Sequence, residues 1–102
     1  MLFIHPMAHI DPALLKEVDR LREANRSLQA LVVLDRASVA EQGSAVGEVV
    51  DSLMDEVQRE SQVAPSRVVV FKNIRSFAIE APARFIDQLL KHQQVVSATL
   101  NE

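Results

Sequence analysis

The sequence contains no cysteine, no tryptophan and no tyrosine, and only 2 of its 102 residues are glycine. Without cysteine the chain has no disulfide, no thiolate nucleophile and no cysteine-based metal site. So few glycines exclude a glycine-rich phosphate-binding loop. The shortage of aromatic residues also argues against RNA binding by sheets that stack bases on aromatic side chains.

Strong positive charge and long apolar runs are absent as well. The net charge is −3 at pH 7, whereas general nucleic-acid binders present a basic face. No stretch approaches the roughly 20 apolar residues of a membrane span. Residues 1–10 lack the Lys or Arg that begins a secretory signal. We therefore expect a cytoplasmic globular protein with neither nucleic acid nor a membrane as partner.

The first periodic segment predicts an amphipathic helix from Asp11 to about Asn25. Asp11 can accept a hydrogen bond as N-cap, and Pro12 suits the first turn of a helix. Such a short helix is marginal in water unless its apolar side is buried. The apolar stripe consists of Leu14, Leu15, Val18 and Leu21.

The remaining segments alternate between strand and helix patterns. Short runs rich in Val, Leu and Phe predict strands, and apolar residues at helical spacing predict helices. Lys72-Asn73 is a turn signal between two of the strands, and Pro82 opens the last helix. The expected strands are 28–34, 67–71, 76–80 and 95–100, and the expected helices run over 44–61 and from 82 to about 92.

This order predicts an α+β fold, a ferredoxin-like β-α-β-β-α-β sandwich. Right-handed crossovers place two helices on one face of a four-stranded antiparallel sheet, and the helix of residues 11–25 is an addition. We expect an N-terminal extension over residues 1–27 and the sandwich over residues 28–102.

The face of the sheet away from the two helices is expected to be apolar. Residues 28–34 are largely apolar on both sides of the strand, and Val68 and Val70 alternate with Val69 and Phe71 in residues 67–71, so both sides of that strand are apolar as well. Three covers are conceivable: the N-terminal helix, a second copy packed sheet to sheet, or a partner protein.

Catalytic and metal-binding signatures are weak. His5 and His9 have a spacing that could join two imidazoles on one metal, but Pro6 lies between them and no third ligand is near. Glu48, Asp51 and Asp55 fall on the solvated side of the expected helix. We expect no catalytic residues, no metal and no cofactor, and hence a protein that is not an enzyme.

Residues 28–100 resemble the propeptide-like inhibitors of subtilisin-type serine proteases, which include subtilisin propeptides and the proteinase B inhibitor. The segment "ALVVLD" is similar to the opening strand of that family. The segment "VVVFKNIRSFAIEAPARFIDQLLKHQQVVSATL" is similar to its hairpin, second helix and final strand. Ser76 stands where the family usually has Gly, and the final strand lacks the family's acidic residues.

The resemblance implies a protein-binding module that inhibits a subtilisin-like serine protease or assists its folding. In that family the open sheet face docks on the enzyme, and an extended C-terminal segment enters the cleft. The residues implied to bind the protein partner are Ser97, Thr99, Leu100, Asn101 and Glu102.

Two other functions remain open from the sequence. One is a regulatory or interaction protein of ferredoxin-like fold that homodimerises through its open sheet face. The other is a small-ligand sensor, for which the chain offers no ligand motif.

Overall fold

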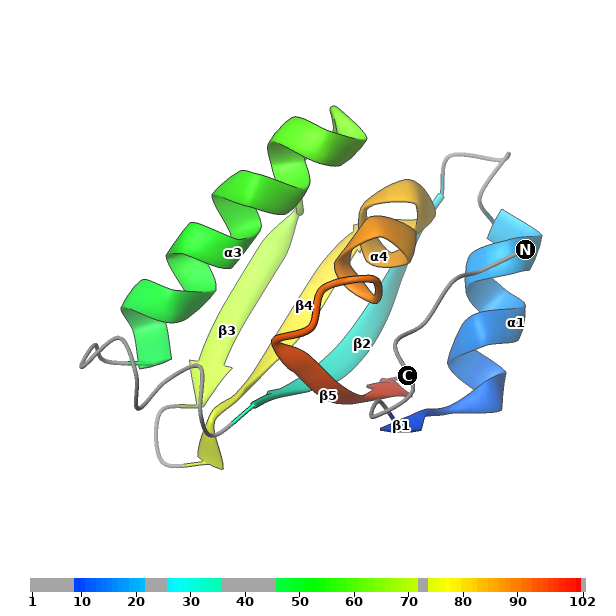
Figure 1. The fold of residues 1–102 in the computed structure, drawn as a ribbon. Coiled ribbons are helices and arrows are strands. Elements are labelled where there is room, and N and C mark those ends of the chain that lie inside the picture. The colour runs from blue at the N-terminus through cyan, green and yellow to red at the C-terminus, as the bar shows by residue number, and fades with distance from the viewer. Residues whose placement is uncertain (1–8, 22–25, 36–45, 72–73, 102) are drawn as a thin grey trace.

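The computed structural model describes residues 9–21, 26–35, 46–71 and 74–101, which form an α+β fold of three helices and one sheet (Figure 1). The sheet has five strands in the order β1-β5-β2-β4-β3. The strands are β1 (His9–Ile10), β2 (Ser27–Leu34), β3 (Arg67–Phe71), β4 (Ser76–Pro82) and β5 (Val95–Leu100), and the helices are α1 (Pro12–Leu21), α3 (Val46–Ser61) and α4 (Ala83–Leu89).

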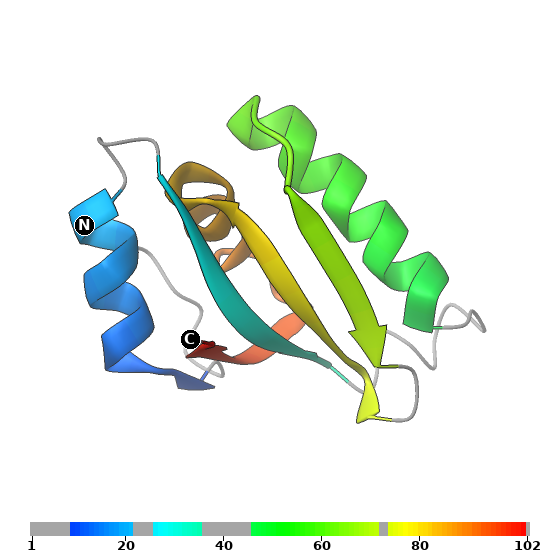
Figure 2. The same cartoon turned by 180° about the vertical axis from the view of Figure 1, so that it is seen from behind.

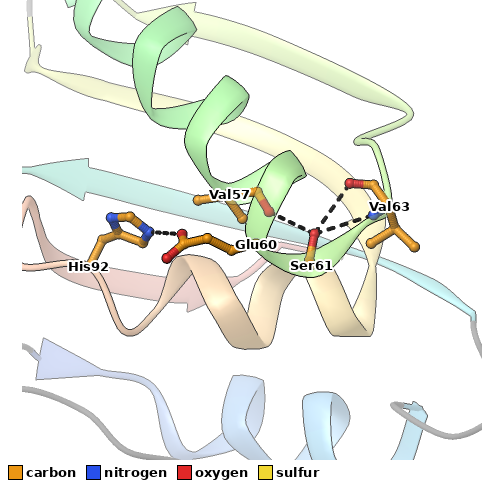
Figure 3. Close-up of polar contacts among 5 residues, drawn as sticks. All are labelled: Val57, Glu60, Ser61, Val63 and His92. Carbon is orange, nitrogen blue, oxygen red and sulfur yellow. Dashed lines mark hydrogen bonds and ion pairs between the residues drawn. The ribbon is translucent and has the colours of Figure 1, made fainter.

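The ends of the helices follow from local chemistry. Asp11 caps α1 as expected, because its Oδ1 accepts a hydrogen bond from the Ala13 N–H at 3.1 Å. At the end of α3 the Ser61 hydroxyl donates to the Val57 carbonyl oxygen at 2.8 Å and lies near the backbone of Val63 (Figure 3). The next residue, Gln62, has a positive φ of 62° and turns the chain away from the helix axis.

The sheet differs from the sequence prediction in its strand number and in one pairing. Each adjacent pair among β5, β2, β4 and β3 is antiparallel, but β1 adds a fifth strand that runs parallel to β5. The prediction of a four-stranded, wholly antiparallel sheet is therefore wrong. Strand β1 was missed because its two residues are too few to show a hydrophobic period. It forms because the outer edge of β5 offers hydrogen-bond partners to its backbone.

Helix α1 packs in the same layer as the other helices. It contacts α4, β5 and β2, while α3 contacts both α4 and β3. Its buried residues Leu14, Val18 and Leu21 belong to one core cluster with residues of β2, β4, α3 and α4. The predicted boundary between an extension over residues 1–27 and a domain over residues 28–102 stays a prediction. Helix α1 nevertheless belongs to the same hydrophobic core as the described residues after residue 27.

The strands alternate between this core and the opposite face. On β2, Ala30 and Val32 have no exposed surface, and they lie opposite Ile79 and Phe77 of β4. The intervening Leu31 and Val33 are only partly buried. Figure 2 views the sheet from this second side, and no described helix crosses in front of β2, β4 and β3. This second side is called the open face below.

Candidate protein-binding surface

Two rows of small and apolar side chains cross the open face. In one row Val69 of β3 lies opposite Ala78 of β4, which lies opposite Leu31 of β2 and then Thr99 of β5. Residues opposite each other on antiparallel strands have their Cβ atoms about 4.5–5.5 Å apart, so each row is a continuous contact surface. The second row consists of Phe71, Ser76, Val33 and Ser97.

The most exposed apolar side chains gather at the β3 side of this face. Among the described residues, the most exposed large hydrophobic side chains are Val69 at 37%, Phe71 at 41% and Ile74 at 62%. Single exposed apolar residues are ordinary, but a contiguous patch is typical of an interaction site. We call the set Leu31, Val33, Val69, Phe71 and Ala78 the apolar patch.

One end of the patch is bordered by polar and charged groups. Gln29 Nε2 donates a hydrogen bond to Glu80 Oε2 at 3.0 Å, and Arg67 lies opposite Glu80 in the β3–β4 register. These residues, with Val69, Phe71, Ala78 and Asn101, line a shallow hollow of about 330 Å³. An apolar centre with a polar border is the usual anatomy of a protein–protein interface.

Ser76 is an unusual member of the second row. It is only 1% exposed, and its Oγ has no hydrogen-bond partner among the described residues. A buried hydroxyl without a partner costs free energy that a Gly or Ala at this position would not.

The residues predicted to bind a partner lie mostly within the sheet. Ser97 and Thr99 belong to the open face, whereas Leu100 packs against the core on the other side. Asn101 is exposed, and its backbone N–H donates to the Gln29 carbonyl oxygen at 2.9 Å. Glu102 lies outside the described residues.

The residues of β3 and β4 that belong to this surface were not predicted from the sequence. Val69 and Phe71 are apolar in the sequence, but only the strand register places them in the same rows as Leu31 and Val33, across β4. The alternation within residues 67–71 was the signal that could have found them. The border residues Gln29 and Glu80 are 51 positions apart in sequence, and no local pattern joins them.

The described histidine and acidic side chains that could support chemistry lie on several different elements. His9 is exposed on β1, and His5 lies outside the described residues. His92 Nε2 is 2.6 Å from Glu60 Oε1, so this pair joins the end of α4 to the end of α3 (Figure 3). Glu48, Asp51 and Asp55 are exposed on α3. The described part of the chain holds no group of three or more His, Asp or Glu side chains suited to a metal ion.

Comparison with known proteins assigns the chain to no family. No protein-family model matches the chain, and no match is found among curated proteins or among solved structures. In the described ranges no helix has the length and apolar character needed to cross a membrane. The case for a function therefore rests on the geometry of the open face.

Proposed function

We propose that the chain is a protein-binding module of the propeptide-like class, which docks a subtilisin-like serine protease on its open face and inhibits it or assists its folding. The strand order β5-β2-β4-β3, with antiparallel pairing throughout these four strands, supports a ferredoxin-like core for this role. We also propose a cytoplasmic location. The absence of cysteine is compatible with it.

The observation that supports docking most directly is the position of α1. A helix lying over the apolar patch would occupy the surface that a partner needs. Instead, α1 packs beside α4 and buries Leu14, Val18 and Leu21 in the core on the other side of the sheet. The patch retains exposed Val69 and Phe71, and a partner that covers it gains the free energy of burying that surface.

The contact we propose is made by the sheet face rather than by an inserted tail. Residues Ser97 to Leu100 pair with β2, and His9 and Ile10 pair with the other side of β5 at Ser97 and Ala98. Their backbone is therefore held within the sheet. Ser97 and Thr99 contribute side chains to the docking face.

An inhibition assay with one matched pair of variants tests the proposal. Ala78 is central in the apolar patch, while Ala64 is exposed in the connection between α3 and β3. The wild-type chain is expected to inhibit a purified subtilisin-type protease with one-to-one stoichiometry. Ala78→Lys should weaken inhibition about tenfold or more. An ammonium group that loses water without gaining a partner costs about 1–3 kcal/mol or more, and about 1.4 kcal/mol corresponds to a factor of ten in affinity. Ala64→Lys should inhibit like the wild type.

Two outcomes would overturn the proposal. Digestion of the wild-type chain without inhibition, and without a higher refolding yield of the denatured protease, would remove the protease as partner. Equal inhibition by Ala78→Lys and Ala64→Lys would place the contact elsewhere. Circular dichroism of both variants checks that each is folded.

The same patch favours a second candidate, a homodimer packed sheet to sheet. In that case light scattering would give twice the chain mass for the wild type and for Ala64→Lys, and the mass of one chain for Ala78→Lys.

A further inference from the structure

The strand β3 lies at the edge of the described sheet and carries little protection against pairing. It has five residues, Arg67–Phe71, and its neighbour on one side is β4. Natural edge strands are usually interrupted by Pro, by an inward-pointing charge or by a bulge. The three central residues of β3 are all Val, and its four register steps with β4 are regular. Such a strand is suited to accept another strand along its outer side.

The two edges of the sheet differ sharply in exposed apolar surface. All three exposed large hydrophobic residues of the described chain lie on β3 or in the turn that follows it. At the opposite edge, β1 has only two residues, of which His9 is exposed and Ile10 packs against the core. Apolar surface at an unpaired edge favours association there rather than at β1.

The sequence of β3 is complementary to itself about Val69. Two copies paired antiparallel around a two-fold axis at Val69 place Val69 opposite Val69 of the second copy. The same register places Arg67 opposite Phe71 of the second copy, twice. Arg67 and Phe71 are both exposed and both belong to the open face. An Arg guanidinium over an aromatic ring is attracted to the negative face of the ring.

The other side of the strand fits the same register. Val68 and Val70, which are half-buried against the core in the single chain, would lie opposite each other across the two-fold axis. Cross-strand pairs of β-branched residues stabilise antiparallel sheets. Each of the five residues of β3 thus meets a suitable residue of the second copy.

We propose that β3 pairs with β3 of a second copy of this chain, antiparallel and centred on Val69, so that the two sheets become one continuous sheet. A second copy fits better than an unrelated extended peptide, because the match of Arg67 with Phe71 and of Val69 with itself is a property of this strand. The pairing leaves the central residues Leu31 and Ala78 of the open face uncovered. The argument for this pairing does not use the protease proposed above, although both contacts involve Val69 and Phe71.

Cysteine cross-linking tests both the pairing and its register, because the natural chain contains no cysteine. Val69→Cys places two thiols directly opposite each other, with Cβ atoms close to the separation of a disulfide. Residues 67 of the two copies would be about 13 Å apart, since four residues of strand separate them. Arg67→Cys mixed with Phe71→Cys should therefore give mixed disulfide dimers, and either variant alone should not.

The control variant is Thr99→Cys, an exposed position on the same face but on β5. After mild oxidation at equal concentration, we expect Val69→Cys to form dimers at least tenfold faster than Thr99→Cys. Light scattering of the wild type should show a mass that rises to that of a dimer with concentration, and Val69→Lys should keep it a monomer.

Three results would overturn the proposal. The first is a wild-type chain that stays monomeric at every concentration. The second is cross-linking of Val69→Cys no faster than that of Thr99→Cys. The third is a mixture of Arg67→Cys and Phe71→Cys that gives no more dimer than each variant alone, which would point to sheet-to-sheet packing instead. None of these results bears on protease inhibition, which is measured separately.

Discussion

The two faces of the sheet are built from the same strands and the same residue types, yet their side chains are buried to different extents. On β2, Ala30 and Val32 are fully buried beneath the helices, whereas Leu31 and Val33 are half-exposed on the open face. Composition alone does not separate these two pairs. The difference arises because α1, α3 and α4 all pack on one side. Burial there stabilises the fold, and the apolar side chains on the other side are available for association.

The largest expected effect comes from comparing one phenylalanine on each face of the sheet. Phe77 on β4 faces the helices and has no exposed surface, while Phe71 on β3 is 41% exposed on the open face. Phe77→Ala should lower the free energy of unfolding by about 3–5 kcal/mol, because it removes a buried ring and leaves a cavity. Phe71→Ala should lower it by about 1 kcal/mol or less. Urea unfolding at low protein concentration measures both.

A similar loss for the two variants would break the comparison. It would mean that Phe71 is as buried in solution as Phe77, which requires a cover over the open face. Repeating the Phe71→Ala measurement over a range of concentrations then identifies a second copy as the cover, because dimer stability depends on concentration.

A smaller effect tests whether α1 belongs to the helical layer. Leu14 has no exposed surface, whereas its neighbour Leu15 is half-buried. Leu14→Ala should cost about 2–5 kcal/mol of unfolding free energy, and Leu15→Ala clearly less. Equal and small losses would show that α1 detaches before the sheet unfolds, and amide hydrogen exchange within α1 would then be fast.

The fold was predictable wherever a segment is long enough to show a period. The strands over 67–71 and 95–100 have the predicted bounds, and the helix predicted over 44–61 is observed as α3, Val46–Ser61. Strand β1 was not predictable, because two residues carry no period. The side on which α1 packs was not predictable either. Its stripe shows that the helix is buried, but not which face of the sheet receives it.

The candidate surface was predictable only in part. The alternation in residues 28–34 and 67–71 shows that each strand has a second apolar side. It does not show that Leu31 meets Ala78, or that Arg67 lies opposite Glu80, because these contacts depend on the register between distant strands. The predicted residues Ser97 and Thr99 do face this surface, while Leu100 points to the core because the strand alternates.

The smallest expected effect concerns the solvent side of α1. Glu17 accepts two hydrogen bonds from the Arg20 guanidinium, at 3.2 Å from Nε and 2.7 Å from Nη2. The hydrogen bond from Arg20 holds the pKa of the Glu17 carboxyl below its ordinary value. A lowered pKa means that the pair stabilises the folded chain fully above the ordinary pKa of Glu. That contribution is lost as the pH falls through the folded pKa.

Because this pair is solvent-exposed, its contribution to stability should be close to the limit of measurement. An NMR titration is the more sensitive test. Arg20→Gln should raise the pKa of Glu17 toward its ordinary value, whereas Lys16→Gln removes the same charge from the adjacent residue and should change it much less. The pKa of Glu17 depends on one contact within α1, so neither variant should change the exposure of the open face. If Arg20→Gln instead altered cross-linking through Val69→Cys, the two sides of the sheet would be coupled through α1 and could not act as independent surfaces.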